Sequence, residues 1–298
     1  MITKLEQVID LVKSKPKKRL VAAFANDAHT IEAVNNAVEL EIINAILIGD
    51  EYSIRLVCKQ LNIDANKFTI INEPDEVKAA ANSCNLINQK EADILMKGAL
   101  STDKYMRAIL NKETGLCPPN GVLTHIAVIE NPAYHKLLIC SDCAIIPEPD
   151  IKQKQVILKH IIKTANAIGI EDPKVAIIAA TEQMSVGMNA CTDAAILSKM
   201  AERGQITGAM IDGPLSIDVS LDLEAAKIKK MTGKVAGDAD GMLFPNIESG
   251  NVFYKCCTKF NKAEIGAFIA GAKVPCVLSS RGDTSLTKLY SIAIAAAF

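Results

Sequence analysis

Short apolar runs alternate with longer amphipathic segments along most of the chain. The β-rich runs lie at 20–24, 45–48, 68–71, 93–96, 125–129, 136–140, 175–179, 209–211, 241–244 and 276–278. Between many of them, apolar residues recur with helical spacing at 31–41, 75–88, 151–168, 190–203 and 223–230. Alternating strands and helices are typical of a mostly parallel sheet covered by helices. The pattern therefore predicts an α/β fold.

The richest cluster of breaker residues lies at 111–121, where Cys117 is followed by Pro118, Pro119, Asn120 and Gly121. Such a cluster is typical of a loop or linker. A chain of 298 residues is also long enough for two domains. We therefore expect a domain boundary near residue 122.

The charge balance and the hydropathy of the chain exclude some classes of function. The 33 basic residues nearly cancel the 34 acidic ones. No large basic field is available for nucleic acid, so a charged ligand must be recognised locally. Residues 1–12 form an amphipathic helical pattern rather than a signal segment, and no apolar run reaches membrane-spanning length. We expect a soluble, cytoplasmic protein with neither a nucleic-acid nor a membrane partner.

Cysteine and histidine patterns give little support for a metal or redox site. The nine cysteines lie mostly inside apolar runs, and their odd number argues against a disulfide framework. Cys140 and Cys143 form a CxxC pair without a second pair at zinc spacing, so metal or redox use is the less favoured alternative. The four histidines show no metal-ligand spacing. We expect no metal site.

Three predicted strands end in a similar way. The runs 93–96, 241–244 and 276–278 are each followed by glycine with serine, threonine or asparagine, and then by a helix that carries lysine or arginine. Ligands bind at such strand ends in parallel sheets, where helix N–H groups, close backbone approach at glycine and bidentate arginine all suit a phosphate. Taken singly, each segment is also compatible with an ordinary turn, with Thr284 or Ser285 as a helix cap in the third. Together they predict a site for a phosphorylated substrate.

The candidate site residues come from all three strand ends. They are Lys97, Gly98, Ser101, Thr102 and Arg107 in the first, Asn246, Ser249, Gly250 and Asn251 in the second, and Ser280, Arg281 and Asp283 in the third. The motif GxxxxGK[ST] is absent, and no GxGxxG follows the first strand. An enzyme that uses a nucleoside triphosphate or a nicotinamide cofactor is therefore disfavoured.

Four segments resemble the phosphate acetyl/butyryltransferase family. They are "MKGALSTDKYMRAILNKETGL" at 96–116, "IDGPLSIDVSL" at 211–221, "FPNIESGNVFYK" at 244–255 and "AGAKVPCVLSSRGDTSLTKLYSIAIAA" at 270–296. "NKETGL", together with "LSKMAERGQITGAMIDGPLSID", is similar to the butyryltransferase branch in particular. The resemblance covers nearly the whole chain.

The resemblance implies acyl transfer between acyl-CoA and inorganic phosphate, without a metal or a permanently bound cofactor and with coenzyme A as a substrate. It also implies two α/β domains with a cleft between them, in the isocitrate/isopropylmalate dehydrogenase-like architecture, and a homo-oligomer. The first domain would be discontinuous, with residues 1–122 plus 274–298, and the second would span 123–273.

The resemblance also assigns roles to single residues. Ser280 and Arg281 match a Ser–Arg pair in which the serine is implicated in the transition state and the arginine in binding coenzyme A or acyl phosphate. Ser101 and Thr102 match phosphate-binding hydroxyl groups, and Arg107 matches the arginine that follows them.

Two positions depart from the family pattern. Thr287 stands where the acetyltransferase branch has an aspartate proposed as the base for the CoA thiol, and 73–95 lacks an expected arginine. Asp283 is the sole carboxylate in 279–288. It is predicted either to accept the proton or orient Arg281, or else to cap the following helix.

Several alternatives stay open on the sequence alone. They are a phosphate acetyltransferase, a non-catalytic sensor of acyl-CoA or acyl phosphate, and a metal-dependent dehydrogenase on the same architecture. The dehydrogenase would need a cluster of acidic or histidine ligands, which the sequence does not suggest. Asp142, Asp212 and Asp218 are expected to serve in turns or caps.

Overall fold

The computed structural model describes residues 2–279 and 282–298. The chain divides into two compact units, which are described separately here. The N-terminal unit comprises 5–123 and 266–298, and the central unit comprises 1–4 and 124–265. The predicted domains, 1–122 plus 274–298 and 123–273, stay a prediction, because compactness alone does not show independent folding.

The sheet of the N-terminal unit is mostly parallel. Its strands follow the order β3-β2-β1-β4-β11-β10, in which β10 runs antiparallel to its neighbour β11 and the other pairs are parallel. The strands are β1 (Lys18–Ala23), β2 (Ile43–Gly49), β3 (Thr69–Asn72), β4 (Ile94–Lys97), β10 (Glu264–Ala270) and β11 (Cys276–Val277). All four residues of β4 are buried, as expected for a strand in the middle of a covered sheet.

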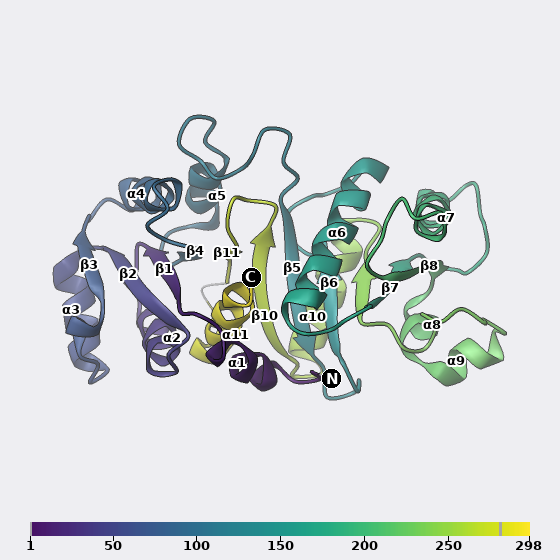
Figure 1. Ribbon diagram of the computed structural model, residues 1–298, viewed down its shortest axis with the longest axis horizontal. Helices are drawn as coiled ribbons and strands as arrows, with labels where there is room; N and C mark the ends of the chain where they lie inside the picture. The colour runs from purple at the N-terminus through teal and green to yellow at the C-terminus, as the bar shows by residue number, and fades with distance from the viewer. Residues whose placement is uncertain (1, 280–281) are drawn as a thin grey trace. The chain divides into compact units, whose positions relative to one another are not determined.

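The helices of this unit begin at polar caps. Asp27, Asp50, Asp75, Ser101 and Thr284 each accept a hydrogen bond from a backbone N–H in the first turn that follows. The helices are α1 (Leu5–Lys13), α2 (Ala28–Glu39), α3 (Glu51–Gln60), α4 (Glu76–Asn88), α5 (Thr102–Leu110) and α11 (Ser285–Ala296), with a short 3₁₀ turn, η1 (Ala65–Lys67). Helix α11 packs against α1 and α2, and α4 packs against α5 (Figure 1).

The central unit has the strand order β5-β6-β9-β7-β8. Strands β5 and β6 are antiparallel, and the other pairs are parallel. The strands are β5 (Thr124–Glu130), β6 (Leu137–Ser141), β7 (Lys174–Ile178), β8 (Met210–Leu215) and β9 (Gly241–Leu243). The helices are α6 (Ile151–Ala167), α7 (Asn189–Glu202), α8 (Ile217–Leu221), α9 (Leu223–Ile228) and α10 (Ile247–Lys259) (Figure 1).

The predicted α/β class with mostly parallel sheets is confirmed. Every predicted β-rich run overlaps a strand of the structure. Strand β10 was not predicted: Ile265, Phe268 and Ile269 favour a strand, but one glycine and two alanines interrupt the run. Its Gly266 allows close packing, since a Cβ there would lie 2.9 Å from Tyr290 C and 3.0 Å from Tyr290 O in the backbone of α11. Among the described residues, no helix is long and apolar enough to cross a membrane.

Candidate active site

The ends of β4 and β11 lie side by side in the N-terminal unit. The strands pair in parallel, with Leu95 opposite Cys276 and Met96 opposite Val277. The buried hydroxyl group of Tyr105 on α5 donates to Leu95 O at 3.3 Å and to Val277 O at 3.1 Å. Two of the three predicted loops therefore leave the same edge of one sheet, which is where ligands bind in this class of fold.

Lys97 ends β4 and is almost fully buried, with 2% of its surface exposed. Its Nζ donates to Gly98 O at 3.2 Å and to Leu100 O at 3.1 Å. An ammonium group withdrawn from water needs such acceptors. In this geometry the lysine side chain therefore supports the loop that it begins.

Gly98 brings the β4 loop against the end of β1. Its N–H donates to Ala23 O at 2.9 Å, and the N–H of Ala99 donates to Phe24 O at 2.8 Å. A Cβ at Gly98 would lie 2.2 Å from Phe24 O, which no side chain tolerates without movement of the backbone. Glycine is needed here for the close approach of two loops.

Ser101 and Thr102 begin α5. Ser101 is the N-cap, and its side chain accepts from the N–H of Lys104 at 3.3 Å, so the simpler cap role is present in the structure. Thr102 is the first helical residue and is exposed. The remaining N–H groups of this first turn are the donors that a phosphate would use.

Arg107 lies farther along α5 and is paired within the helix. Its side chain is 79% exposed, and its Nε lies 2.9 Å from Asp103 Oδ2. An exposed i,i+4 pair of this kind is weak, so the guanidinium group is available to an anionic ligand.

The β11 loop leads into α11. Thr284 is the N-cap, and its Oγ1 accepts from the N–H of Thr287 at 3.1 Å. The alternative that Asp283 caps this helix is therefore wrong, since the cap is the next residue. Ser280 and Arg281 lie outside the described residues.

Lys288 is a feature of this edge that sequence reasoning missed. It is 2% exposed, and its Nζ donates to Ser279 Oγ at 2.7 Å. Burial lowers the pKa of the Lys288 ammonium, while the carboxylates of Asp27 and Asp283 raise it. A lysine within the mostly apolar sequence 286–297 was the available signal.

The predicted residues of the central unit gather where β9 enters α10. Asn246 caps α10, and its Oδ1 accepts from Ser249 N at 3.0 Å and from Ser249 Oγ at 2.7 Å. Asn251 Nδ2 donates to Cys143 O at 2.9 Å. A Cβ at Gly250 would lie 2.1 Å from Asp142 O. These four residues hold the first turn of α10 against the exit of β6.

The carboxylate of Asp142 at that exit accepts hydrogen bonds from its own loop and from β5. Its Oδ1 accepts from the N–H groups of Ala144 and Ile145 at 2.7 and 2.9 Å, and its Oδ2 accepts from Thr124 Oγ1 at 2.9 Å. The predicted turn role for Asp142 therefore agrees with the geometry. Asp212 accepts from Gly213 N, and Asp218 pairs with Lys229.

The CxxC pair has the properties of core residues. Cys140 and Cys143 are both buried, and burial raises the pKa of each thiol well above its ordinary value. A thiol held protonated is a poor nucleophile and a poor metal ligand. Within the described ranges, 2–279 and 282–298, no group of three or more His, Cys, Asp and Glu residues is placed to hold a metal ion.

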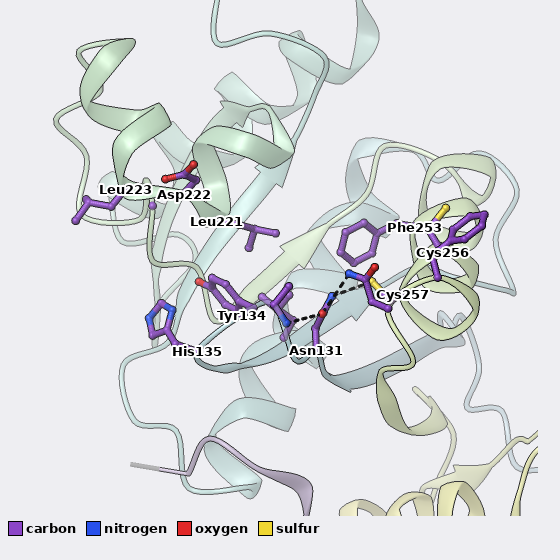
Figure 2. A pocket seen from close by; sticks show the side chains of 14 residues that line it. Asn131, Tyr134, His135, Leu221, Asp222, Leu223, Phe253, Cys256 and Cys257 are labelled. Atoms are coloured by element: carbon purple, nitrogen blue, oxygen red, sulfur yellow. Dashed lines mark hydrogen bonds between the residues drawn. The ribbon is translucent and has the colours of Figure 1, made fainter.

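Two cavities of the central unit differ in their lining. One, of about 480 Å³, is lined by Asn246 and by Lys154, which pairs with Asp193 at 2.6 Å. The other, of about 660 Å³, is lined by none of the predicted site residues. Figure 2 shows the side chains that line it, among which Asn131 Nδ2 donates a hydrogen bond to Cys257 Sγ. Its mostly apolar lining offers no match to a phosphate.

Fold and site together define the class of the protein. It is an α/β protein whose parallel strands end in lysine, glycine and hydroxyl side chains at the starts of helices, an arrangement suited to a phosphorylated small molecule. The family described as phosphate acetyl/butaryl transferase matches residues 3–85 and 75–296. The chain belongs to this family, as the sequence resemblance predicted.

Known relatives agree with this assignment. The chain is 43% identical over 296 residues to a phosphate butyryltransferase from Clostridium acetobutylicum, covering 99% of this chain and 98% of that protein. It is 38% identical over 294 residues to a phosphate acetyltransferase from Thermotoga maritima, covering 99% of each. The crystal structure of a branched-chain phosphotransacylase from Enterococcus faecalis V583 has a TM-score of 0.81 at 27% identity, covering 93% of this chain and 97% of that one. The predicted phosphate acyltransferase activity is confirmed at this level.

Proposed function

We propose that the protein transfers a butyryl group between coenzyme A and inorganic phosphate. In the direction of acyl phosphate synthesis, a phosphate oxygen attacks the thioester carbonyl, the C–S bond breaks, and the thiolate leaves and takes up a proton. The observation that carries the butyryl assignment is the 43% identity, over 99% of the chain, to a phosphate butyryltransferase. An acetyl group is the second candidate, because a phosphate acetyltransferase is 38% identical over the same extent.

The candidate residues have separate roles in this proposal. The N–H groups at the start of α5 bind phosphate oxygens, and Lys97 and Gly98 hold the loop that presents them. Arg281 and Arg107 bind phosphate or coenzyme A, and Ser280 stabilises the transition state. Asn246, Ser249, Gly250 and Asn251 contribute through the first turn of α10 in the central unit.

The test is an assay of phosphate-dependent coenzyme A release with acetyl-, propionyl-, butyryl- and valeryl-CoA. We expect kcat/KM to peak at butyryl-CoA and to fall gradually, since one methylene in an apolar pocket is worth about 1–3 kcal/mol. A higher kcat/KM with acetyl-CoA would establish the acetyltransferase instead. Coenzyme A binding without turnover of any acyl-CoA would indicate the sensor.

The cellular setting is part of the same proposal. The protein acts in the cytoplasm, in butanoate metabolism, as a homo-oligomer that needs acyl-CoA and phosphate but no metal or bound cofactor. Light scattering of the purified chain tests the oligomer. An assay with and without a chelator tests the metal requirement, and retained activity is expected.

A further inference from the structure

A buried ion-dipole contact joins the exit of β11 to the first turn of α11. The ammonium group of Lys288 donates to the hydroxyl group of Ser279 at 2.7 Å. Both residues are withdrawn from water, with 2% and 5% of their surfaces exposed. The contact spans nine residues of chain, which include the predicted catalytic segment.

This position is unfavourable for a cation. Lys288 lies in the first turn after the cap Thr284, where the helix dipole repels positive charge. Its neighbours Leu289 and Ile292 are buried apolar residues. The burial that lowers the pKa of Lys288 also costs stability, and the hydrogen bond to Ser279 offsets part of that cost.

The charges around Lys288 come from two further segments. Asp27, at the exit of β1, caps α2 by accepting from Thr30 N at 2.9 Å, and α2 packs against α11. Asp283 lies just before α11. Both carboxylates act on the ammonium group. Lys288 therefore makes its hydrogen bond to the exit of β11 and lies within the electrostatic influence of both carboxylates.

We propose that Lys288 is a positioning residue for acyl transfer, acting through its buried hydrogen bond to Ser279 to fix the exit of β11. This inference rests on the proposed function. A displacement of about 1 Å at a reacting group costs about a hundredfold in rate, so a rigid exit of this strand has direct catalytic value. This positioning role explains why a lysine occupies a position that is unfavourable for a cation.

The experiment compares Lys288→Met, Ser279→Ala and the double variant with wild type. We expect Lys288→Met to lower kcat by about tenfold to a hundredfold, with KM for acyl-CoA and phosphate changed by less than about threefold. Its Tm is expected to stay close to that of wild type, because relief from burying the charge offsets the loss of the hydrogen bond to Ser279. The double variant should be no slower than Lys288→Met alone, because the two residues act as one unit. Lys59→Met, at an exposed site on α3, is the matched control.

Other results would overturn the proposal. They are a wild-type kcat in Lys288→Met, a loss of activity that follows a large fall in Tm, a change confined to KM, or additive effects in the double variant. If wild type shows no turnover, the proposed function fails by itself. Hydrogen exchange of the peptide 276–288 then decides the positioning role: faster exchange in Lys288→Met supports it, and unchanged exchange refutes it.

Discussion

The phenol of Tyr105 on α5 donates to the backbone carbonyl of Val277 at 3.1 Å and so ties the β4–α5 loop segment to the last residue of β11. It also reaches Leu95 O on β4 at 3.3 Å. One side chain therefore holds together the two strands whose ends carry most of the candidate site.

Tyr105→Phe is expected to destabilise the protein modestly and to lower kcat. The change removes buried hydrogen bonds that together contribute about 1–2 kcal/mol, while the ring still fills its site. Urea unfolding followed by circular dichroism measures the loss. Tyr52→Phe, at an exposed ring on α3, is the control and should leave both quantities unchanged. Equal stability of the two variants would contradict the structural role of the hydroxyl group.

Gly98→Ala is expected to reduce both activity and stability. A Cβ would lie 2.2 Å from Phe24 O, so the β4 loop must move away from the end of β1, at a cost of about 1–3 kcal/mol. Thermal unfolding and steady-state kinetics measure the two effects. The matched control is Gly187→Ala, since a Cβ at Gly187 meets nothing within 4 Å. Normal kcat/KM in Gly98→Ala would show that this close approach is not required.

Arg281→Ala and Arg107→Ala are expected to raise KM for phosphate or coenzyme A. A charge-assisted contact is worth about 1.5–3 kcal/mol, which corresponds to about tenfold to a hundredfold in KM. Arg203→Ala, on the C-terminal cap of α7, is the control. Unchanged constants in both test variants would remove these arginines from the site. Because the ion pair between Arg107 and Asp103 is exposed, we expect Arg107→Ala to leave the free energy of unfolding unchanged.

Asp283→Asn tests whether this carboxylate accepts the thiol proton. If the carboxylate accepts the thiol proton, the variant has a lower kcat and loses the acidic limb of its pH–rate profile, at unchanged Tm. Thr284→Ala is the companion variant, because it removes the observed cap and should cost about 1 kcal/mol of stability. Near-normal kcat across pH in Asp283→Asn would exclude the carboxylate as the base.

The central unit contains a charge network that predicts a pH-dependent stability. Burial raises the pKa of Asp238, but hydrogen bonds from Lys136 and Lys174 outweigh it and lower that pKa to about 2. A depressed carboxylate pKa stabilises the fold above the ordinary value of 3.8. This stability is lost as the pH falls from about 4 to about 2.

Urea unfolding between pH 2 and pH 7 tests whether the free energy of unfolding falls as the pH is lowered. Asp238→Asn should have lower stability at pH 7 than wild type and a weaker dependence on pH below 4. Asp10→Asn, at an exposed carboxylate on α1, should keep the wild-type dependence. A parallel pH dependence in wild type and Asp238→Asn would refute the contribution of this network.

The sequence by itself determined the elements and the kind of chemistry. The position of an apolar residue along a strand or helix reflects which face of that element is buried. The sequence therefore shows the strand at 93–96 and the helix at 151–168 directly. The sequence also showed that three strand ends are rich in glycine and hydroxyl side chains. It showed as well the resemblance to the phosphate acetyl/butyryltransferase family. The family assignment followed from these patterns and is confirmed.

Only the tertiary structure decided how these elements pair. Tyr105 and Val277 lie 172 residues apart, and no local pattern encodes that β11 inserts between β4 and β10. The sequence could not predict, for the same reason, that Lys288 contacts Ser279 in the interior or that the Asp27 carboxylate acts on its ammonium group. A lysine in an apolar helix has the same sequence whether its ammonium group reaches water or a buried hydroxyl group, because long-range packing alone sets its surroundings.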